Sequence, residues 1–210
     1  MKTALATAAI IVMSAFGAIP ALAQQRSPMR MPAGPATLRS TLDTQLTIVE
    51  REFEGAADAM PEDKYDFAPT NGDFKGVRTF AQQVKHVATA NDRFFGSILG
   101  QPPAKAPNYF EQENGPDSIK TKAQIMQYLR ESFAEGHKAI ASITDANAFE
   151  RLTNSPTPFL NTRASIAIFA CVHANDHYGQ MVEYLRDNGI VPPASRNRPL
   201  ANPAAPPAGK

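Results

Sequence analysis

The chain has 210 residues, including 21 Lys and Arg, 20 Asp and Glu, and one cysteine, Cys171. This balance of charge excludes a protein built to bind a polyanion such as nucleic acid, and a lone cysteine excludes an internal disulfide. Stability must therefore come from the packing of one domain, together with any bound metal.

Residues 1–23 have the pattern of a signal peptide. Lys2 is a short basic segment, an apolar run extends from Ala4 to Ile19, and Ala21-Leu22-Ala23 supplies small residues for cleavage before Gln24. A retained membrane anchor is the alternative, but the apolar run is shorter than the ~18 residues that a spanning helix needs. We therefore expect a periplasmic or secreted protein with no stable membrane span after cleavage. Loss of Lys2 leaves equal numbers of basic and acidic residues.

Two segments flank the expected domain and are too poor in apolar residues to fold. Residues 24–37 contain three prolines among small and basic residues, and residues 192–210 are dominated by Pro and Ala. We interpret the first as a disordered linker and the second as a disordered tail. The folded domain is then expected to span residues 38–191.

The first two predicted helices follow from the spacing of apolar residues. One runs from about Leu38 to Met60, with apolar residues every three or four positions, and Pro61 ends it. The other begins at Thr79, which forms a capping-box pattern with Gln82, and stops at Gly100. This second helix carries His86.

The last two predicted helices have equally clear boundaries. Thr121 and Gln124 form a second capping-box pattern, and the helix that follows carries His137. The fourth helix begins near Thr162 and ends at Gly189. Four amphipathic helices without a strand signal predict an all-α protein, a four-helix bundle with long loops.

Long connections separate the helices. Residues 65–76 and 101–118 are rich in Pro, Gly and Asn, and loops of this kind often cover a site on a bundle. Residues 143–162 are numerous enough to hold one further short turn.

The fourth helix carries the strongest candidate for chemistry. His173 and His177 are one turn apart, so both imidazoles share one narrow stripe with Ile166, Phe169, Gln180 and Tyr184. Buried imidazoles need partners for both nitrogens, which a metal ion or hydrogen bonds can supply. The pair therefore indicates two ligands of one metal, and the alternative is a pair of hydrogen-bonded core histidines.

The third ligand cannot be chosen from periodicity. By the helical pitch, His86 lies about 120° and His137 about 80° from the centre of the apolar face of its own helix. Neither histidine is placed facing the core, so both remain candidates at this point.

Three motifs together resemble the DinB-like (DinB/YfiT) superfamily over about residues 38–193. They are the loop Tyr65-Asp66-Phe67-Ala68-Pro69, the second-helix histidine, and the element from His173 to Gly189 with its His-x-x-x-His-x-Gly-Gln pattern. The resemblance implies a four-helix bundle with one divalent metal held by His86, His173 and His177. His137 matches no ligand position, and we expect it on the flank of its helix.

Three neutral histidines would leave an open metal position, where a bound water is acidified toward about pH 7. Zinc is the expected metal, although nickel, iron or manganese also suits imidazole ligands. Gln180 is expected either to orient a ligand or bound water, or to be an ordinary helix amide. Asp176 is either a partner for His173 or a solvated carboxylate. Cys171 should face away from the metal, as a buried thiol.

Peptidase activity is not expected, because Ala174 stands where a zinc peptidase needs a glutamate base. Three other function classes fit this site. A hydrolase that uses a metal-activated water on an unknown small molecule is preferred. A thiol-dependent S-transferase or isomerase is implied by characterised relatives, but exported compartments are poor in reduced thiols. A non-catalytic metal-binding module is the third class. The resemblance also allows a homodimer.

Overall fold

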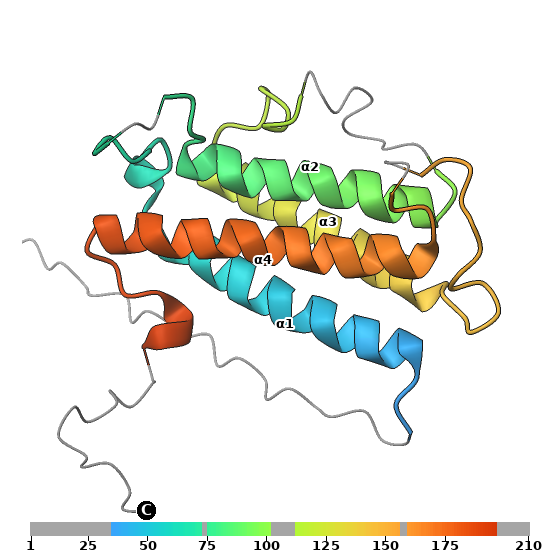
Figure 1. The fold of residues 1–210 in the computed structure, drawn as a ribbon. Helices are drawn as coiled ribbons and strands as arrows, with labels where there is room; N and C mark the ends of the chain where they lie inside the picture. The colour runs from blue at the N-terminus through green and yellow to red at the C-terminus, as the bar shows by residue number, and fades with distance from the viewer. Residues whose placement is uncertain (1–34, 73–74, 102–111, 156–158, 197–210) are drawn as a thin grey trace, which may run out of the picture. The chain divides into compact units, whose positions relative to one another are not determined.

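The computed structural model describes residues 35–72, 75–101, 112–155 and 159–196 (Figure 1). The described part of the chain is helical, with only isolated β-bridges such as Arg151–Thr162. Its elements are α1 (Leu38–Ala59), the 3₁₀ turn η1 (Glu62–Lys64), α2 (Phe80–Ile98), α3 (Lys122–Ala141), α4 (Arg163–Asp187) and the 3₁₀ turn η2 (Pro193–Ser195). The predicted all-α four-helix bundle is confirmed. The predicted signal peptide and most of both predicted disordered segments lie outside the described residues.

Each α-helix begins at a threonine whose side chain accepts a hydrogen bond from the third helical residue. The two predicted capping boxes, at Thr79 and Thr121, are confirmed. Two further boxes pair Thr37 with Ser40 and Thr162 with a serine three residues later. They were missed because the usual pattern has Glu or Gln at the third position, whereas here a serine hydroxyl accepts from the cap backbone.

Two glycines end helices as expected. Gly100 follows α2 with φ +74° and Gly189 follows α4 with φ +71°, a left-handed conformation that other residues rarely adopt. The residues between α3 and α4 form no further helix in their described part. They contain a turn at residues 145–149 and the antiparallel bridge between Arg151 and Thr162.

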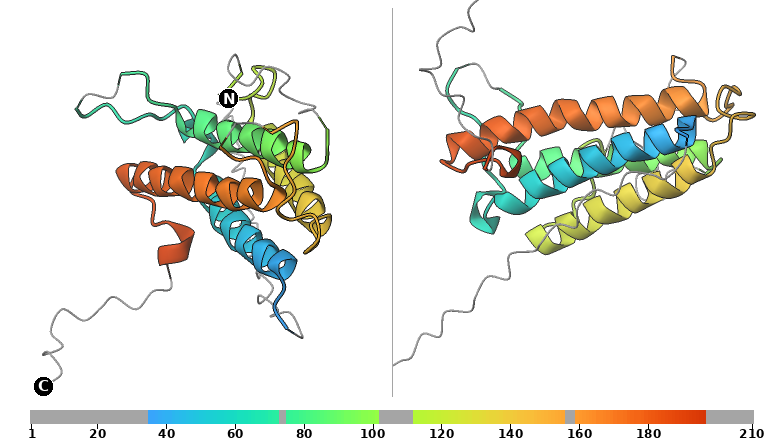
Figure 2. Two further views of the ribbon diagram at one scale, coloured as in Figure 1. Left: turned by 45° about the vertical axis from the view of Figure 1, so that its right-hand side comes forward. Right: turned by 90° about the horizontal axis from the view of Figure 1, so that it is seen from below.

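The four helices pack in a ring in which α2 contacts α3 and α4, and α1 contacts the same two helices. Their shared core includes Phe53, Phe80, Phe95, Phe133, Leu129 and Ile166. Figures 1 and 2 show α2 and α3 running in the same direction, with α1 and α4 running the opposite way. The chain must therefore return along the length of α2, about 28 Å, before α3 begins.

This return path explains why α2 is buried on almost every side. Residues 112–119 of the connection between α2 and α3 lie against α2. Lys85 Nζ donates to the carbonyls of Pro116 and Ile119, at 3.2 and 3.4 Å. Gly115 permits the close approach, because it has φ +79° and a Cβ there would lie 2.6 Å from Lys85 Cβ. The loop thereby buries a second face of α2, and His86 lies beneath the loop.

The boundary of the folded region needs one correction. Residues 192–196 were expected at the start of a disordered tail, but Pro192 is buried and η2 packs against α1. The apolar surface of Pro192 is covered there, which composition alone does not reveal. None of the helices in the described ranges is long and apolar enough to cross a membrane.

Candidate metal centre

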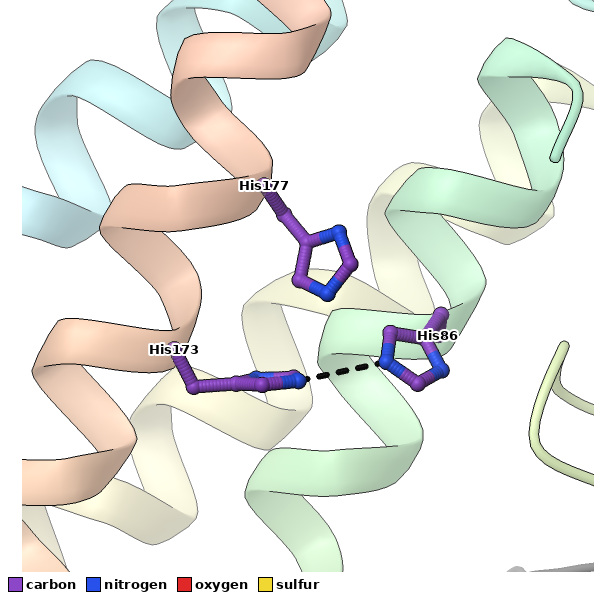
Figure 3. Close-up of side chains that lie close together, drawn as sticks. All are labelled: His86, His173 and His177. Carbon is purple, nitrogen blue, oxygen red and sulfur yellow. Dashed lines mark hydrogen bonds between the residues drawn. The ribbon is translucent and has the colours of Figure 1, made fainter. Parts of the chain in front are cut away.

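Three histidines from two helices converge between α2 and α4. His86 points from α2, and His173 and His177 point from successive turns of α4 toward the same space (Figure 3). One nitrogen from each ring lies within 4.8 Å of the others, and the Nε2 atoms of His86 and His173 are 3.2 Å apart. The structure thus brings together the three residues that the resemblance singled out.

The fourth histidine does not join them. His137 lies on α3, with Nδ1 2.7 Å from Asp43 Oδ1 and Nε2 3.0 Å from Glu50 Oε2, both on α1. The two carboxylates raise its pKa to about 9, the hydrogen bond to Glu50 being the largest cause. His137 is therefore a half-buried cation that bridges α1 and α3, and its expected place on a helix flank is confirmed.

A chain of side-chain hydrogen bonds orients His177. Asp176 accepts from Gln180 Nε2 at 2.9 Å, Gln180 Oε1 accepts from Gln83 Nε2 at 2.8 Å, and Gln83 Oε1 lies 2.6 Å from His177 Nδ1. A carboxylate can only accept, so it sets the direction of both amides. His177 must then donate from Nδ1, which leaves the lone pair of Nε2 directed into the site.

His86 is fixed in the same tautomer by the loop that covers α2. Its Nδ1 lies 2.5 Å from the backbone carbonyl of Glu113, an acceptor that requires a hydrogen on that nitrogen. The lone pair of His86 is therefore on Nε2, which faces His173. Metal-binding histidines commonly donate their other nitrogen to a carbonyl or a carboxylate in this way.

His173 is held by aromatic contacts. Phe169 stacks on its ring with centroids 6.1 Å apart, and Phe94 meets it edge-on at 5.7 Å. Its Nδ1 is buried and has no hydrogen-bond partner within the described ranges. Asp176, for which a role as a partner of His173 was one of two alternatives, lies on the exposed surface of α4 and accepts from Gln180. Gln180 likewise serves the hydrogen-bond chain to His177.

The surroundings keep all three imidazoles neutral near pH 7. Burial lowers the pKa of His173 to about 4 and that of His177 to about 3. Burial also lowers the pKa of His86, against an opposing effect of the Glu113 carbonyl. The neighbouring imidazoles and the Arg78 guanidinium act in the same direction as burial on His173 and His177. Neutral imidazole is the form that binds metals.

These residues fit a divalent metal ion. His86 and His177 are buried residues whose Nε2 lone pairs are directed to one space, where a cation or a hydrogen-bond donor can satisfy both. Two nitrogens on a tetrahedral zinc with bonds of ~2.0–2.1 Å are about 3.3 Å apart, close to the 3.2 Å between His86 and His173. The donor set, three imidazoles, is one that zinc and its neighbours accept.

Two features of the site escaped the sequence analysis. Gln83 is buried and holds His177 directly, but an amide three residues before His86 carries no pattern of its own. The Glu113 acceptor is a backbone atom, so its side chain gives no signal. Only the position of the loop against α2 brings that carbonyl to His86.

Comparison with known proteins agrees with this architecture. A crystal structure from Exiguobacterium sibiricum, of a protein assigned to the DinB family, superposes with a TM-score of 0.50 at 17% identity, covering 74% of this chain and 95% of the other. At that identity the likeness supports the fold alone. No curated protein matches the chain. A family model described as the DinB superfamily matches residues 45–181, which include all three histidines. The chain therefore belongs to the DinB superfamily.

Proposed function

We propose that this protein is an exported metalloenzyme that holds one divalent metal ion, zinc by expectation, through Nε2 of His86, His173 and His177. The reaction is hydrolysis of a small molecule whose identity is unknown. One observation carries the proposal: hydrogen bonds to Glu113 and Gln83 fix two buried histidines so that both Nε2 lone pairs face the same space.

The residues of this chain have separable roles in that proposal. Glu113 and Gln83 hold the rings of His86 and His177, while Phe94 and Phe169 hold the ring of His173 by packing. Burial keeps the three rings unprotonated, so metal and proton compete little near neutral pH. A bound divalent ion supplies Lewis acidity that makes a water molecule or a thiol a better nucleophile.

An open coordination position favours an enzyme over a structural site. Structural zinc sites close with a fourth protein ligand, whereas catalytic sites keep three. In the described ranges, the clustered set of His, Cys, Asp or Glu ligands contains these three histidines and no fourth member. A thiol substrate would use the same open position, but the signal-peptide pattern of residues 1–23 favours an oxidising compartment with little reduced thiol.

Metal content tests the ligand assignment. The protein is purified from its native compartment without chelator, alongside His86→Ala, His173→Ala and the matched variant His137→Ala. We expect one metal ion per chain, lost in the first two variants and kept in the third. A metal-free wild type, or metal that persists in His173→Ala, would overturn the site.

Turnover separates the enzyme from a non-catalytic module. The metal-loaded protein is tested on a panel of carboxylic esters, amides and phosphate esters, with His177→Ala as the control for adventitious hydrolysis. Hydrolysis that needs both the metal and His177 supports the proposal. Full metal occupancy with no turnover above the variant on any member of the panel would favour storage or structural binding.

A further inference from the structure

One side of the histidine triad is an aromatic wall. Phe169 precedes His173 by one turn of α4, and the two rings are stacked with an interplanar angle of 29°. Phe94, from α2, stands edge-on to Phe169 at 5.4 Å and edge-on to His173 at 5.7 Å. The wall thus joins both helices that supply the triad.

Phe94 belongs to the buried core, whereas Phe169 does not, contrary to the sequence pattern. Phe169 is 36% exposed, and its neighbours Ile168 and Val172 are 52% and 58% exposed. Phe53 and Phe133, which fill the bundle, are completely buried. Exposed apolar side chains beside polar groups are typical of binding surfaces, because a ligand can cover them.

Charged side chains lie near the triad toward the C-terminal end of α4, where Tyr184 Oη donates to the carbonyl of Arg78 at 2.9 Å. Arg78 Nη2 lies 3.3 Å from Glu113 Oε2, and Arg78 Nε donates to Asn114 Oδ1 at 2.7 Å. Asp176 lies on the exposed surface of α4, three residues after His173. A ligand bound through the triad therefore meets apolar surface toward the aromatic wall and charged side chains toward the C-terminal end of α4. This asymmetry gives the ligand a preferred orientation.

We infer that Phe169, backed by Phe94, binds an apolar substituent next to the metal-binding group of the substrate and so determines specificity. The inference rests on the proposed metal site and deepens it. The substrate class it names is a small molecule with a hydrolysable polar group that carries an aromatic or branched aliphatic substituent. Covering about 60 Å² of apolar surface at ~25 cal/mol/Å² corresponds to roughly tenfold in affinity.

Two hydroxamates that differ only in this substituent test the inference. The full chain is loaded with cobalt(II), and its visible absorption is titrated with acetohydroxamate and with benzohydroxamate. In the wild type we expect benzohydroxamate to bind roughly tenfold more tightly. In Phe169→Ala the two should bind within about twofold of each other, and Phe169→Leu should be intermediate.

Ile168→Ala is the matched control. Ile168 is also exposed and apolar, but its side chain leaves α4 about 100° away from that of Phe169. This variant should keep the tenfold preference. Cobalt stoichiometry measured for every variant checks that the triad is intact, so that a lost preference reports on the wall alone.

The outcomes separate the inference from the proposed function. If neither hydroxamate perturbs the cobalt spectrum, the metal has no open coordination position, and the proposed function is then wrong as well. If both bind equally well to the wild type, the metal site stands and the aromatic wall is overturned. Size-exclusion chromatography of the same variants tests the alternative that a second copy of the chain covers this surface. A dimer lost in both Ile168→Ala and Phe169→Ala, without a change in preference, would assign this surface to a second copy of the chain.

Discussion

Gln83 Oε1 lies 2.6 Å from His177 Nδ1, and that contact decides which nitrogen of His177 carries the hydrogen. The direction of the contact is set two side chains away by Asp176, through the amide of Gln180. A surface carboxylate thereby determines that Nε2 of His177 presents a lone pair.

Replacing Gln83 with leucine should weaken metal binding by about 10–100-fold, the range found when such outer partners of metal-binding histidines are lost. The imidazole loses its acceptor and can rotate or change tautomer. Competition of zinc against a chromophoric chelator measures the change. Gln127→Leu removes an exposed amide on α3 and should leave the affinity unchanged. Equal affinities for wild type and Gln83→Leu would show that the hydrogen-bond chain is without consequence.

Removal of the metal should destabilise the bundle without unfolding it. The core of the described helices does not include the triad, and an ion present at 100-fold above its Kd adds about 2.7 kcal/mol to the free energy of unfolding. Thermal unfolding with and without chelator measures this difference. His173→Ala should show the same transition in both conditions. A chelator effect of equal size in His173→Ala would point to metal bound elsewhere.

The ion pairs of His137 should make stability depend on pH. Its pKa is raised from about 6.5 in the unfolded chain to about 9 in the folded one. The resulting stability is fully present below pH 6.5 and is lost as pH rises through about 9. With its side chain 31% exposed, solvent screening reduces the contribution to about 1 kcal/mol.

His137→Gln should therefore be less stable than the wild type by about 1 kcal/mol at pH 6, and the two should converge by about pH 10. Urea unfolding at both pH values, with chelator present so that the triad contributes no metal binding, gives the comparison. Asp43→Asn and Glu50→Gln should each reproduce part of the effect, since these carboxylates face His137 from α1. A difference that stays constant with pH would contradict the assignment.

Gly136 and Gly179 should respond oppositely to alanine. A Cβ at Gly136 would lie 2.6 Å from Phe95 Cε2 and 2.9 Å from Leu46 Cδ2, so α3 would have to move away from both neighbours. We expect a net loss of about 1–2 kcal/mol, overpacking being partly offset by helix propensity. At Gly179 nothing lies within 4 Å, and alanine should add about 0.5–1 kcal/mol. Urea unfolding of both variants decides, and equal effects would contradict this account of the core.

Periodicity predicted the helices well because their caps and apolar stripes are local properties. It failed to predict burial in two situations. In one, a loop covers a helix face that was expected to be exposed, and in the other, a side chain expected on the inward stripe is exposed. His86 was placed far from the core face of α2, yet the loop at residues 112–119 buries it. Phe169 was placed on one stripe with Ile166 and the two histidines, yet its side chain is 36% exposed whereas Ile166 is fully buried. His86 was therefore singled out as the third candidate ligand through the family resemblance and not through the helical wheel.

Under the proposed function, the carbonyl of Glu113 would give the covering loop a share in metal binding. It holds His86 only while residues 112–119 rest on α2 through Lys85 and Gly115. Closure of the loop and occupancy of the site are consequently linked equilibria, and linkage is reciprocal. If a bound metal favours the closed loop by a given factor, then opening the loop weakens metal binding by the same factor. A substitution at Gly115 that lifts the loop from α2 would therefore lower metal affinity. Gly115 would thus influence metal affinity without contacting any of the three histidines.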